Sequence, residues 1–292
     1  MFVEGDLWPR LVLAAHRQGI PLLLLNARHS KTRERFPSTY LTLLNGFKGI
    51  TCRSQQVADG FRAIGVAPHV LQILPDLRIT ASGRRQPDSE SHLAEHTTNR
   101  TVWLATSTHQ QDEEPVLAAH ERLLASDPDA LLIIAPRYPR RGSQLVSNAR
   151  KKALEVARRS TQQGLLPSTQ VYIADTLGEL ALFFSVASLA FVGGSFGDQG
   201  GHNPYEPASY GLPVISGIRV RNFDDAYAAL AHAGAAILVA DQTAFERYLL
   251  DLLSSDKGAR MGEAGRNFVA NCEEGVTASV KLIKSVQVSG QQ

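Results

Sequence analysis

Short, almost continuous apolar runs recur along this chain and alternate with stretches whose apolar residues have helical spacing. Residues 21–26, 102–105, 131–135 and 189–192 are examples of such runs. Strands of a parallel sheet are covered on both faces, so they read as apolar runs rather than as alternating patterns. The alternation of these runs with amphipathic stretches predicts an α/β fold with a doubly wound parallel sheet.

The pattern can be resolved into individual elements. The expected strands are 21–26, 49–53, 69–74, 102–105, 131–135, 171–174, 189–192, 213–216 and 235–239. The expected helices are 11–18, 54–64, 113–125, 143–162, 177–187, 241–255 and 257–272, with one more from the glycine-rich loop through Tyr210. We interpret 143–162 as one long basic helix.

A polar stretch, residues 81–100, separates two α/β series and is expected to be a linker or a loose surface helix. The sequence therefore predicts two Rossmann-like domains, residues 1–97 and 98–292. The first segment supplies only two or three strands, fewer than expected for a domain of roughly 100–150 residues. We expect this domain to be incomplete, as if the sequence began inside it.

Composition narrows the possible functions. The 292 residues are 43% hydrophobic and 20% charged, which is typical of a soluble globular protein. A formal net charge of +2 argues against a nucleic-acid partner. The two cysteines, Cys52 and Cys272, are far apart, and the histidines are scattered, so no metal-binding spacing is present. The cysteine usage suits a reducing compartment, and no apolar run approaches the roughly 20 residues of a membrane span.

The run FVGGSFGDQGGHNPYEPASYGLP, residues 191–213, is the most informative motif. Its order is strand, glycine loop, helix start and a new strand, which is where phosphorylated ligands bind in open α/β sheets. Glycines let backbone N–H groups approach an anion. Glu206, in the first helical turn, suits the two hydroxyls of a ribose. For His202 a plain structural role is the default interpretation.

Three more polar segments follow predicted strands. Ser107 and Thr108 could bind phosphate or sugar oxygens, or simply cap the next helix, and the two interpretations have equal weight. Arg137, after Pro136, could clamp a phosphate, or belong to a solvated basic loop. Gly178, in the segment Asp175 to Leu180, could let a ligand approach the backbone, although helix capping explains that segment better.

Taken together, these segments resemble the 3-deoxy-D-manno-octulosonic acid (Kdo) transferase family. The resemblance rests on LWPRLVLAAHRQGIPLLLLNAR, ATSTHQQDEE, IIAPRYPRR, DTLGEL and FVGGSFGDQGGHNPYEPASYGLPV, in this order. It implies a GT-B architecture and an inverting transfer of Kdo from CMP-Kdo to a lipid A precursor in lipopolysaccharide synthesis, without metal or cofactor. It also implies work at the cytoplasmic face of the bacterial inner membrane, although this chain shows no membrane segment.

The resemblance also implies which residues contact CMP. They fall in three matched motifs: Pro136 and Arg137; Leu177, Gly178 and Glu179; and Asn203, Pro204, Tyr205 and Glu206. Ser107 and Thr108 are a further addition to this set.

The chain departs from the family pattern in three places. The family's general-base glutamate lies in a Ser-Val-Gly-Glu type motif that nothing here matches, and Glu4 belongs to a different motif. LPDLRIT replaces a Gly-Asn-Leu-Lys-like turn, and Tyr138 stands where the family usually has His. We therefore expect CMP binding with poor or no transfer. The alternatives are a non-catalytic nucleotide-binding module and another GT-B enzyme, such as a UDP-sugar transferase or epimerase.

Overall fold

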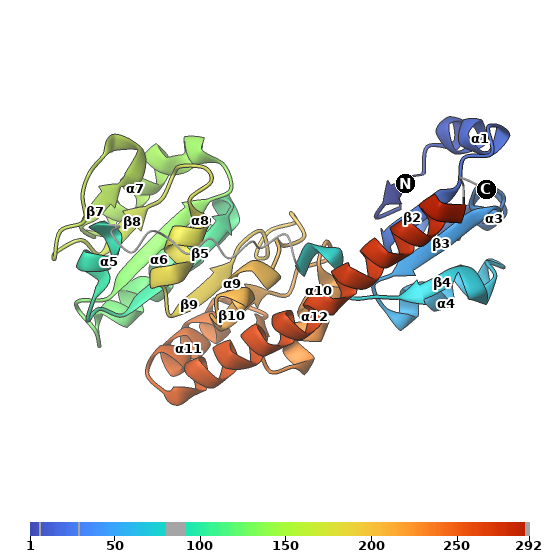
Figure 1. The fold of residues 1–292 in the computed structure, drawn as a ribbon. Coiled ribbons are helices and arrows are strands. Elements are labelled where there is room, and N and C mark those ends of the chain that lie inside the picture. The colour runs from blue at the N-terminus through green and yellow to red at the C-terminus, as the bar shows by residue number, and fades with distance from the viewer. Residues whose placement is uncertain (6, 29, 80–91, 290–292) are drawn as a thin grey trace. The chain divides into compact units, whose positions relative to one another are not determined.

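The computed structural model of the chain describes residues 1–5, 7–28, 30–79 and 92–289. The chain forms two compact units, and each is built around a parallel sheet (Figure 1). The first unit comprises residues 1–81 and 271–292, and the second comprises residues 82–270. The predicted α/β class with two Rossmann-like, GT-B-like domains is confirmed.

The first unit contains a four-stranded parallel sheet with the strands in chain order. The strands are β1 (Phe2–Val3), β2 (Leu22–Ala27), β3 (Phe47–Cys52) and β4 (Leu71–Ile73). The helices are α1 (Pro9–Arg17), α2 (Lys31–Arg35), α3 (Pro37–Leu44) and α4 (Gln55–Ala63), with short 3-10 turns at Pro68–Val70 and Leu77–Ile79. The expected strands 21–26 and 49–53 are present, whereas 69–74 shortens to β4.

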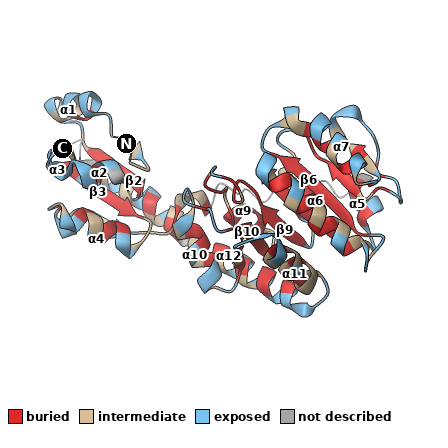
Figure 2. Cartoon of the chain, turned by 180° about the vertical axis from the view of Figure 1, so that it is seen from behind, coloured by how far each residue is buried: buried red, intermediate tan, exposed pale blue. Residues whose placement is uncertain are grey.

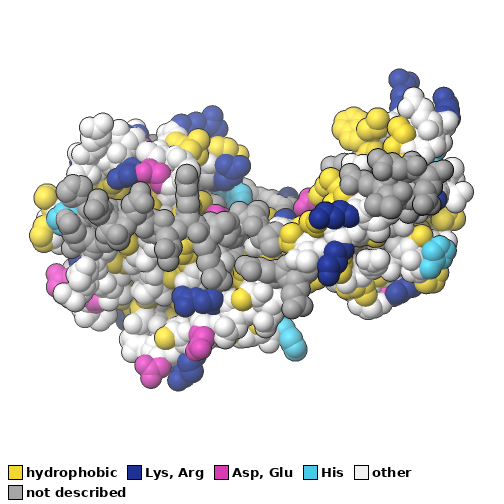
Figure 3. Space-filling view, in the orientation of Figure 1, with side chains coloured by type: hydrophobic (Ala, Val, Ile, Leu, Met, Phe, Trp, Pro, Cys, Tyr) yellow, Lys and Arg dark blue, Asp and Glu magenta, His cyan; other side chains and the backbone are white. Residues whose placement is uncertain are grey.

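The core of the first unit explains why these elements form. β2 is buried along its whole length, which matches its apolar sequence. Ser54 caps α4 by accepting the N–H of Val57 at 3.3 Å. By contrast, α1 buries only Val12. Trp8, just before this helix, is 70% exposed, and Figure 3 shows apolar side chains gathered over α1 beside Lys and Arg.

The second unit contains a seven-stranded parallel sheet with the order β11-β10-β9-β5-β6-β8-β7. The strands are β5 (Val102–Thr108), β6 (Leu131–Pro136), β7 (Val156–Arg158), β8 (Val171–Ile173), β9 (Leu189–Val192), β10 (Val214–Gly217) and β11 (Ala236–Val239). The chain leaves β5 toward β6 on one side and later returns to β9 on the other. The crevice at the carboxyl ends of β5 and β9 is therefore the topological switch point, where open α/β sheets bind ligands.

Helices cover both faces of this sheet, and Figure 2 shows its strands buried between them. The helices are α5 (His92–Thr97), α6 (Gln110–Leu124), α7 (Gly142–Lys151), α8 (Leu180–Val186), α9 (Tyr205–Ser209), α10 (Asp224–His232), α11 (Gln242–Leu253) and α12 (Asp256–Ser289). Alternate residues of β5 enter different cores: Trp103 packs with α6, α7 and α11, whereas Leu104 packs with α5 and α8. The sheet is doubly wound, as predicted.

The prediction of one long helix over 143–162 is wrong. α7 ends at Lys151, and Ala153 has a left-handed φ of 58°. The chain then forms the edge strand β7, in which Ala157 pairs with Tyr172 of β8. The sequence predicted one long basic helix, but pairing with residues fifteen positions further on decides the conformation of 156–158.

Other boundaries also differ from expectation. The helix expected at 257–272 continues as α12 to Ser289, and its residues from Asn271 on belong to the first unit. There, Leu282 lies against Gly49 of β3, where an added Cβ would be 3.2 Å from its side chain. The predicted domains 1–97 and 98–292 had assigned this tail to the second domain. α2, α3 and α10 were not predicted. Within the expected linker 81–100, residues 81–91 lie outside the described residues, and α5 follows them.

Candidate nucleotide-binding site

Three loops meet at the switch point of the second unit, after β5, β6 and β9. Thr106 of β5 is in register with Ala135 of β6 and with Val192 of β9. The next residue after β9, Gly193, donates its N–H to the Thr106 carbonyl at 2.9 Å. A Cβ on Gly193 would come within 2.7 Å of the Ser107 carbonyl oxygen. The glycine therefore allows the backbones after β5 and β9 to touch.

The carboxylate of Asp112 fixes the shape of this crevice. Asp112 lies in the first turn of α6, is fully buried, and accepts the N–H of His109 at 2.8 Å. It also accepts the N–H groups of Gly194 at 2.7 Å, Phe196 at 3.1 Å and Ser195 at 3.3 Å. The acidic run at the start of α6 thus includes one residue that holds the glycine loop.

Arg137, at the end of β6, is a cation without an acidic partner. Its N–H donates to the Thr108 carbonyl at 3.0 Å, which anchors its backbone beside β5. Its side chain is exposed, and no carboxylate of the described residues forms an ion pair with it. Arg141 differs, because Glu113 binds its guanidinium through two hydrogen bonds of 2.5 and 2.6 Å. Arg137 can therefore bind an anion. Arg140 is also exposed and has no ion pair among the described residues, but it lies further from the end of β6.

Two histidines face each other across the crevice. The Nε2 atoms of His109 and His202 are 2.9 Å apart, and the two ring planes differ by only 3°. The centroids are 5.2 Å apart, so the rings meet nitrogen to nitrogen rather than face to face. Tyr138 contacts His109 edge-on, with 5.6 Å between centroids. The default interpretation of His202 as a plain structural residue does not describe this contact.

The segment Asn203 to Glu206 begins α9. The Asn203 side chain accepts the N–H of Tyr205 at 3.1 Å. Pro204 and Tyr205 are buried, and the Tyr205 ring lies parallel to that of Phe268 in α12. Glu206 is partly exposed, and burial raises the pKa of its carboxyl above the ordinary value. Of these four residues, only Asn203 and Glu206 have polar side chains that are partly exposed.

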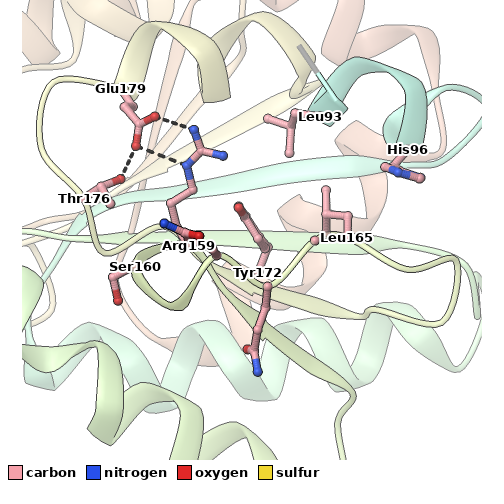
Figure 4. Close-up of a pocket in the computed structure, with 11 residues that line it drawn as sticks. Leu93, His96, Arg159, Ser160, Leu165, Tyr172, Thr176 and Glu179 are labelled. Carbon is pink, nitrogen blue, oxygen red and sulfur yellow. Dashed lines mark hydrogen bonds and ion pairs between the residues drawn. The ribbon is translucent and has the colours of Figure 1, made fainter.

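The loop after β8 holds the third predicted group. Leu177 is 76% exposed, and Gly178 has a φ of 82° with no atom near the position of a Cβ. The Glu179 carboxylate accepts hydrogen bonds from Arg159, at 2.5 and 3.2 Å, and from the Thr176 hydroxyl (Figure 4). These bonds lower the pKa of Glu179, the one from Arg159 most. Leu177 and Gly178 are therefore exposed and open to a ligand, whereas the Glu179 carboxylate is already paired.

Two arginines at the end of the unexpected strand β7 anchor this loop: Arg158, its last residue, and Arg159, the next one. Arg158 donates to Asp175 at 2.6 Å, and Ser160 donates to Asp175 through its N–H and its hydroxyl. Capping was the better explanation of these acidic residues from sequence, but the side chains of Asp175 and Glu179 pair with Arg158 and Arg159 instead. Beside the Arg159–Glu179 pair lies a cavity of about 690 Å³ (Figure 4).

Ser107 and Thr108 differ in whether their side chains are accessible. Ser107 has a left-handed φ of 54° and is partly exposed at the crevice. Thr108 is fully buried, and its hydroxyl has no hydrogen-bond partner. Ser107 can therefore reach a ligand with its side chain, whereas the Thr108 side chain cannot. Among the described residues, no group of three or more His, Cys, Asp or Glu side chains is placed to hold a metal ion.

This geometry can be compared with known proteins. Residues 1–81 match the family described as 3-Deoxy-D-manno-octulosonic-acid transferase (kdotransferase). The chain also resembles the C-terminal CMP-Kdo binding domain of WaaA from Acinetobacter baumannii. The two share 31% sequence identity with a TM-score of 0.54, over 63% of this chain and 93% of that domain. The chain belongs to the Kdo transferase family.

Relatives in this family match both units. A probable mitochondrial 3-deoxy-D-manno-octulosonic acid transferase of Arabidopsis thaliana is 37% identical over 273 residues, covering 88% of this chain and 60% of the relative. The Haemophilus influenzae Kdo transferase is 31% identical over 90% of this chain and 64% of its own length. The chain thus spans less than two thirds of the length of these two Kdo transferases.

A more distant neighbour shows the fold alone. A putative UDP-N-acetylglucosamine 2-epimerase from Listeria monocytogenes has a TM-score of 0.59 at 18% identity, over 89% of this chain and 68% of that one. In the described part of this Kdo transferase homologue, every helix is too short or too polar to cross a bilayer.

Proposed function

We propose that the second unit binds CMP-Kdo at the carboxyl ends of β5, β6 and β9. The observation that carries this proposal is Arg137, an arginine without an acidic partner, beside the glycine loop that Asp112 holds in place. A CMP-sugar has a phosphate that such a guanidinium can bind through two hydrogen bonds. The similarity to the A. baumannii CMP-Kdo binding domain supports the choice of ligand.

Three groups in our proposal bind different parts of CMP. Arg137 binds the phosphate, and Glu206 accepts hydrogen bonds from the ribose hydroxyls. The exposed backbone at Leu177 and Gly178 contacts the cytosine. Asn203 completes the rim next to Glu206, while Pro136, Pro204 and Tyr205 shape the loops.

We further propose that the reaction is transfer of Kdo to a lipid A precursor in lipopolysaccharide synthesis, at the cytoplasmic face of the inner membrane. The acceptor hydroxyl gives its proton to a base, the role of the family's glutamate that nothing in this sequence matches, and its oxygen attacks the anomeric carbon of Kdo as the bond from that carbon to the phosphate oxygen breaks. The departing CMP keeps the electron pair of that bond. A fixed cation next to the phosphate stabilises the developing charge, which is the role that we assign to Arg137.

Calorimetry with CMP and UDP tests the binding site. We expect CMP to bind more tightly than UDP. Arg137→Ala should weaken CMP binding by at least about 1 kcal/mol, roughly fivefold, because a charge-assisted hydrogen bond is lost. Arg150→Ala, which removes an exposed arginine of α7, is the matched control and should leave the affinity unchanged. Preference for UDP, or equal CMP affinity in both variants, would reject the proposal.

The transfer itself needs a separate assay. Incubation with CMP-Kdo and a lipid A precursor should give little or no increase in the acceptor mass, because nothing in this sequence matches the family's general-base motif. Conversion of most of the acceptor, with a mass gain of one or more Kdo units, would contradict this expectation and show a working enzyme. CMP binding with no mass gain at all would favour the non-catalytic nucleotide-binding module.

A further inference from the structure

The His109–His202 contact joins two loops at the switch point. His109 precedes α6, and Asp112 holds its backbone. His202 lies in the loop after β9, where its carbonyl accepts the Tyr227 hydroxyl at 3.2 Å. At a separation of 2.9 Å, one Nε2 must carry a proton and the other must accept it. In the neutral pair, the ring that donates through Nε2 therefore has an unprotonated Nδ1.

The charged groups around the pair come from two segments, α6 and the loop after β6. Asp112 and Glu113 lie on α6, and Arg137 and Arg141 follow β6. Asp112 is hydrogen-bonded to four backbone N–H groups, and Glu113 is paired with Arg141. Arg137 is the charge of this set that lacks a partner in the described chain, and it opposes protonation of both imidazoles.

The unliganded site accordingly keeps the pair neutral. Burial, and then the neighbouring His109 and Arg137, lower the pKa of His202 to about 4. Burial also lowers the pKa of His109, and the charge of Arg137 contributes. An anion bound to Arg137 would raise the pKa of the two imidazoles, because it neutralises the arginine and its own negative charge favours a protonated ring.

We propose that the His109–His202 pair takes up one proton when the anionic group of a cytidine phosphodiester binds beside Arg137. The inference rests on the proposed function, because it requires CMP-Kdo at this crevice. The proton comes from solvent and binds the unprotonated Nδ1 of the ring that donates, so the Nε2 contact survives. The resulting cationic pair adds a second positive charge near the phosphate that leaves with CMP. The proton returns to solvent when CMP leaves.

The test measures protons as well as affinity. The probe is the methyl ester of CMP, a diester whose single negative charge does not change between pH 5 and 9. Calorimetry at pH 7 in buffers of different ionisation enthalpy gives the number of protons bound with the ester. We expect uptake toward one proton, and an affinity that rises as the pH falls from 8 to 6, by up to about tenfold per pH unit.

Variants separate this role from simple loop bridging. His109→Gln and His202→Gln should bind the ester without proton uptake and with little pH dependence. His232→Gln, at an exposed position of α10, should behave like the unmodified protein. If the two variants do not fold, imidazole NMR titration of the unmodified protein replaces them, and the pKa of one ring should rise when the ester binds.

The outcomes distinguish the two proposals. Ester binding without proton uptake, or without a rise in either imidazole pKa, would overturn the role of the pair and leave the CMP site intact. Failure of the ester and of CMP to bind at all would overturn both.

Discussion

The Asp112 carboxylate accepts the backbone N–H of Gly194 at 2.7 Å, although the two residues are 82 positions apart in the chain. This bond joins the first turn of α6 to the loop after β9. Both segments border the crevice where we place CMP-Kdo, so the shape of the site depends on one buried side chain.

Replacing Asp112 by Asn should damage both stability and binding. An asparagine amide presents N–H donors to the N–H groups that the carboxylate now accepts, leaving at least one without a partner. We expect the free energy of unfolding to fall by about 2–4 kcal/mol and CMP binding to weaken with it. Urea unfolding measures the first effect and calorimetry the second. Asp129→Asn, at an exposed position, is the control, and an equal loss there would contradict this role.

Gly193→Ala should disturb the contact between β5 and the glycine loop. The new methyl group would come within 2.7 Å of Ser107 and Thr108 backbone atoms, which cannot move aside as a flexible side chain could. We expect a loss of about 1–3 kcal/mol of stability, as for overpacked sites. Gly164→Ala makes the same change where no atom lies within 4 Å. Similar midpoints of urea unfolding for the two variants would show that the backbone contact is not close in solution.

Glu206→Gln should have opposite effects on stability and on CMP binding. Burial raises the pKa of this carboxyl, so the folded state favours its protonated form. Stability from this group is therefore greatest below the ordinary Glu pKa and decreases as the pH rises through the folded value. Removing the charge should raise the free energy of unfolding at pH 7, yet weaken CMP binding by about 1 kcal/mol because the ribose loses a charged acceptor.

Thermal unfolding and CMP calorimetry on the same samples check this prediction. Glu263→Gln, at an exposed position of α12, is the matched control and should change neither quantity. A Glu206→Gln protein that is less stable at pH 7 would contradict the expected sign.

His120 should make the second unit sensitive to acid. Its Nδ1 accepts the Trp103 indole N–H at 3.2 Å, so its Nε2 carries the proton and donates to the Gln170 carbonyl at 2.8 Å. Burial lowers the pKa of His120 to about 4. Because the unfolded chain binds the proton near pH 6.5, stability is lost as the pH falls from there toward 4, by up to about 3 kcal/mol.

Urea unfolding at several pH values measures this slope. His120→Gln should reduce the loss of unfolding free energy at low pH. Part of the loss should remain, because His202 has a similarly low pKa. His232→Gln should leave the slope unchanged. A His120→Gln protein with the full slope would assign the acid sensitivity to other groups.

The prediction of the sheet succeeded where strands are buried on both faces. β2, β5, β6 and β9 consist of apolar runs because helices or loops cover them from both sides. β7 was missed because Val156–Arg158 is a short edge strand whose sequence carries no such run. Its arginine is partly exposed and charged, which is typical of a helix surface as much as of a sheet edge.

In the candidate site, too, some features were visible in the sequence and others were not. Arg137 was identified because a charged residue directly after an apolar run is visible in the sequence. Glu206 was identified as a carboxylate in the first helical turn after the glycine loop, and the contacts of both residues with CMP remain predictions. The pairing of Glu179 with Arg159 was not visible, since it depends on β7. The His109–His202 pair was missed as well, although both histidines follow strands, because the adjacency of β5 and β9 was unknown.

The sequence by itself determined the α/β class, most strands, the glycine loop and the family, because these depend on local hydrophobic patterns and on motifs with fixed spacing. Only the tertiary structure decided which loops share the crevice, which acids pair with arginines, and which histidines meet. Those contacts join residues tens of positions apart, and strand order, which no local pattern encodes, brings them together.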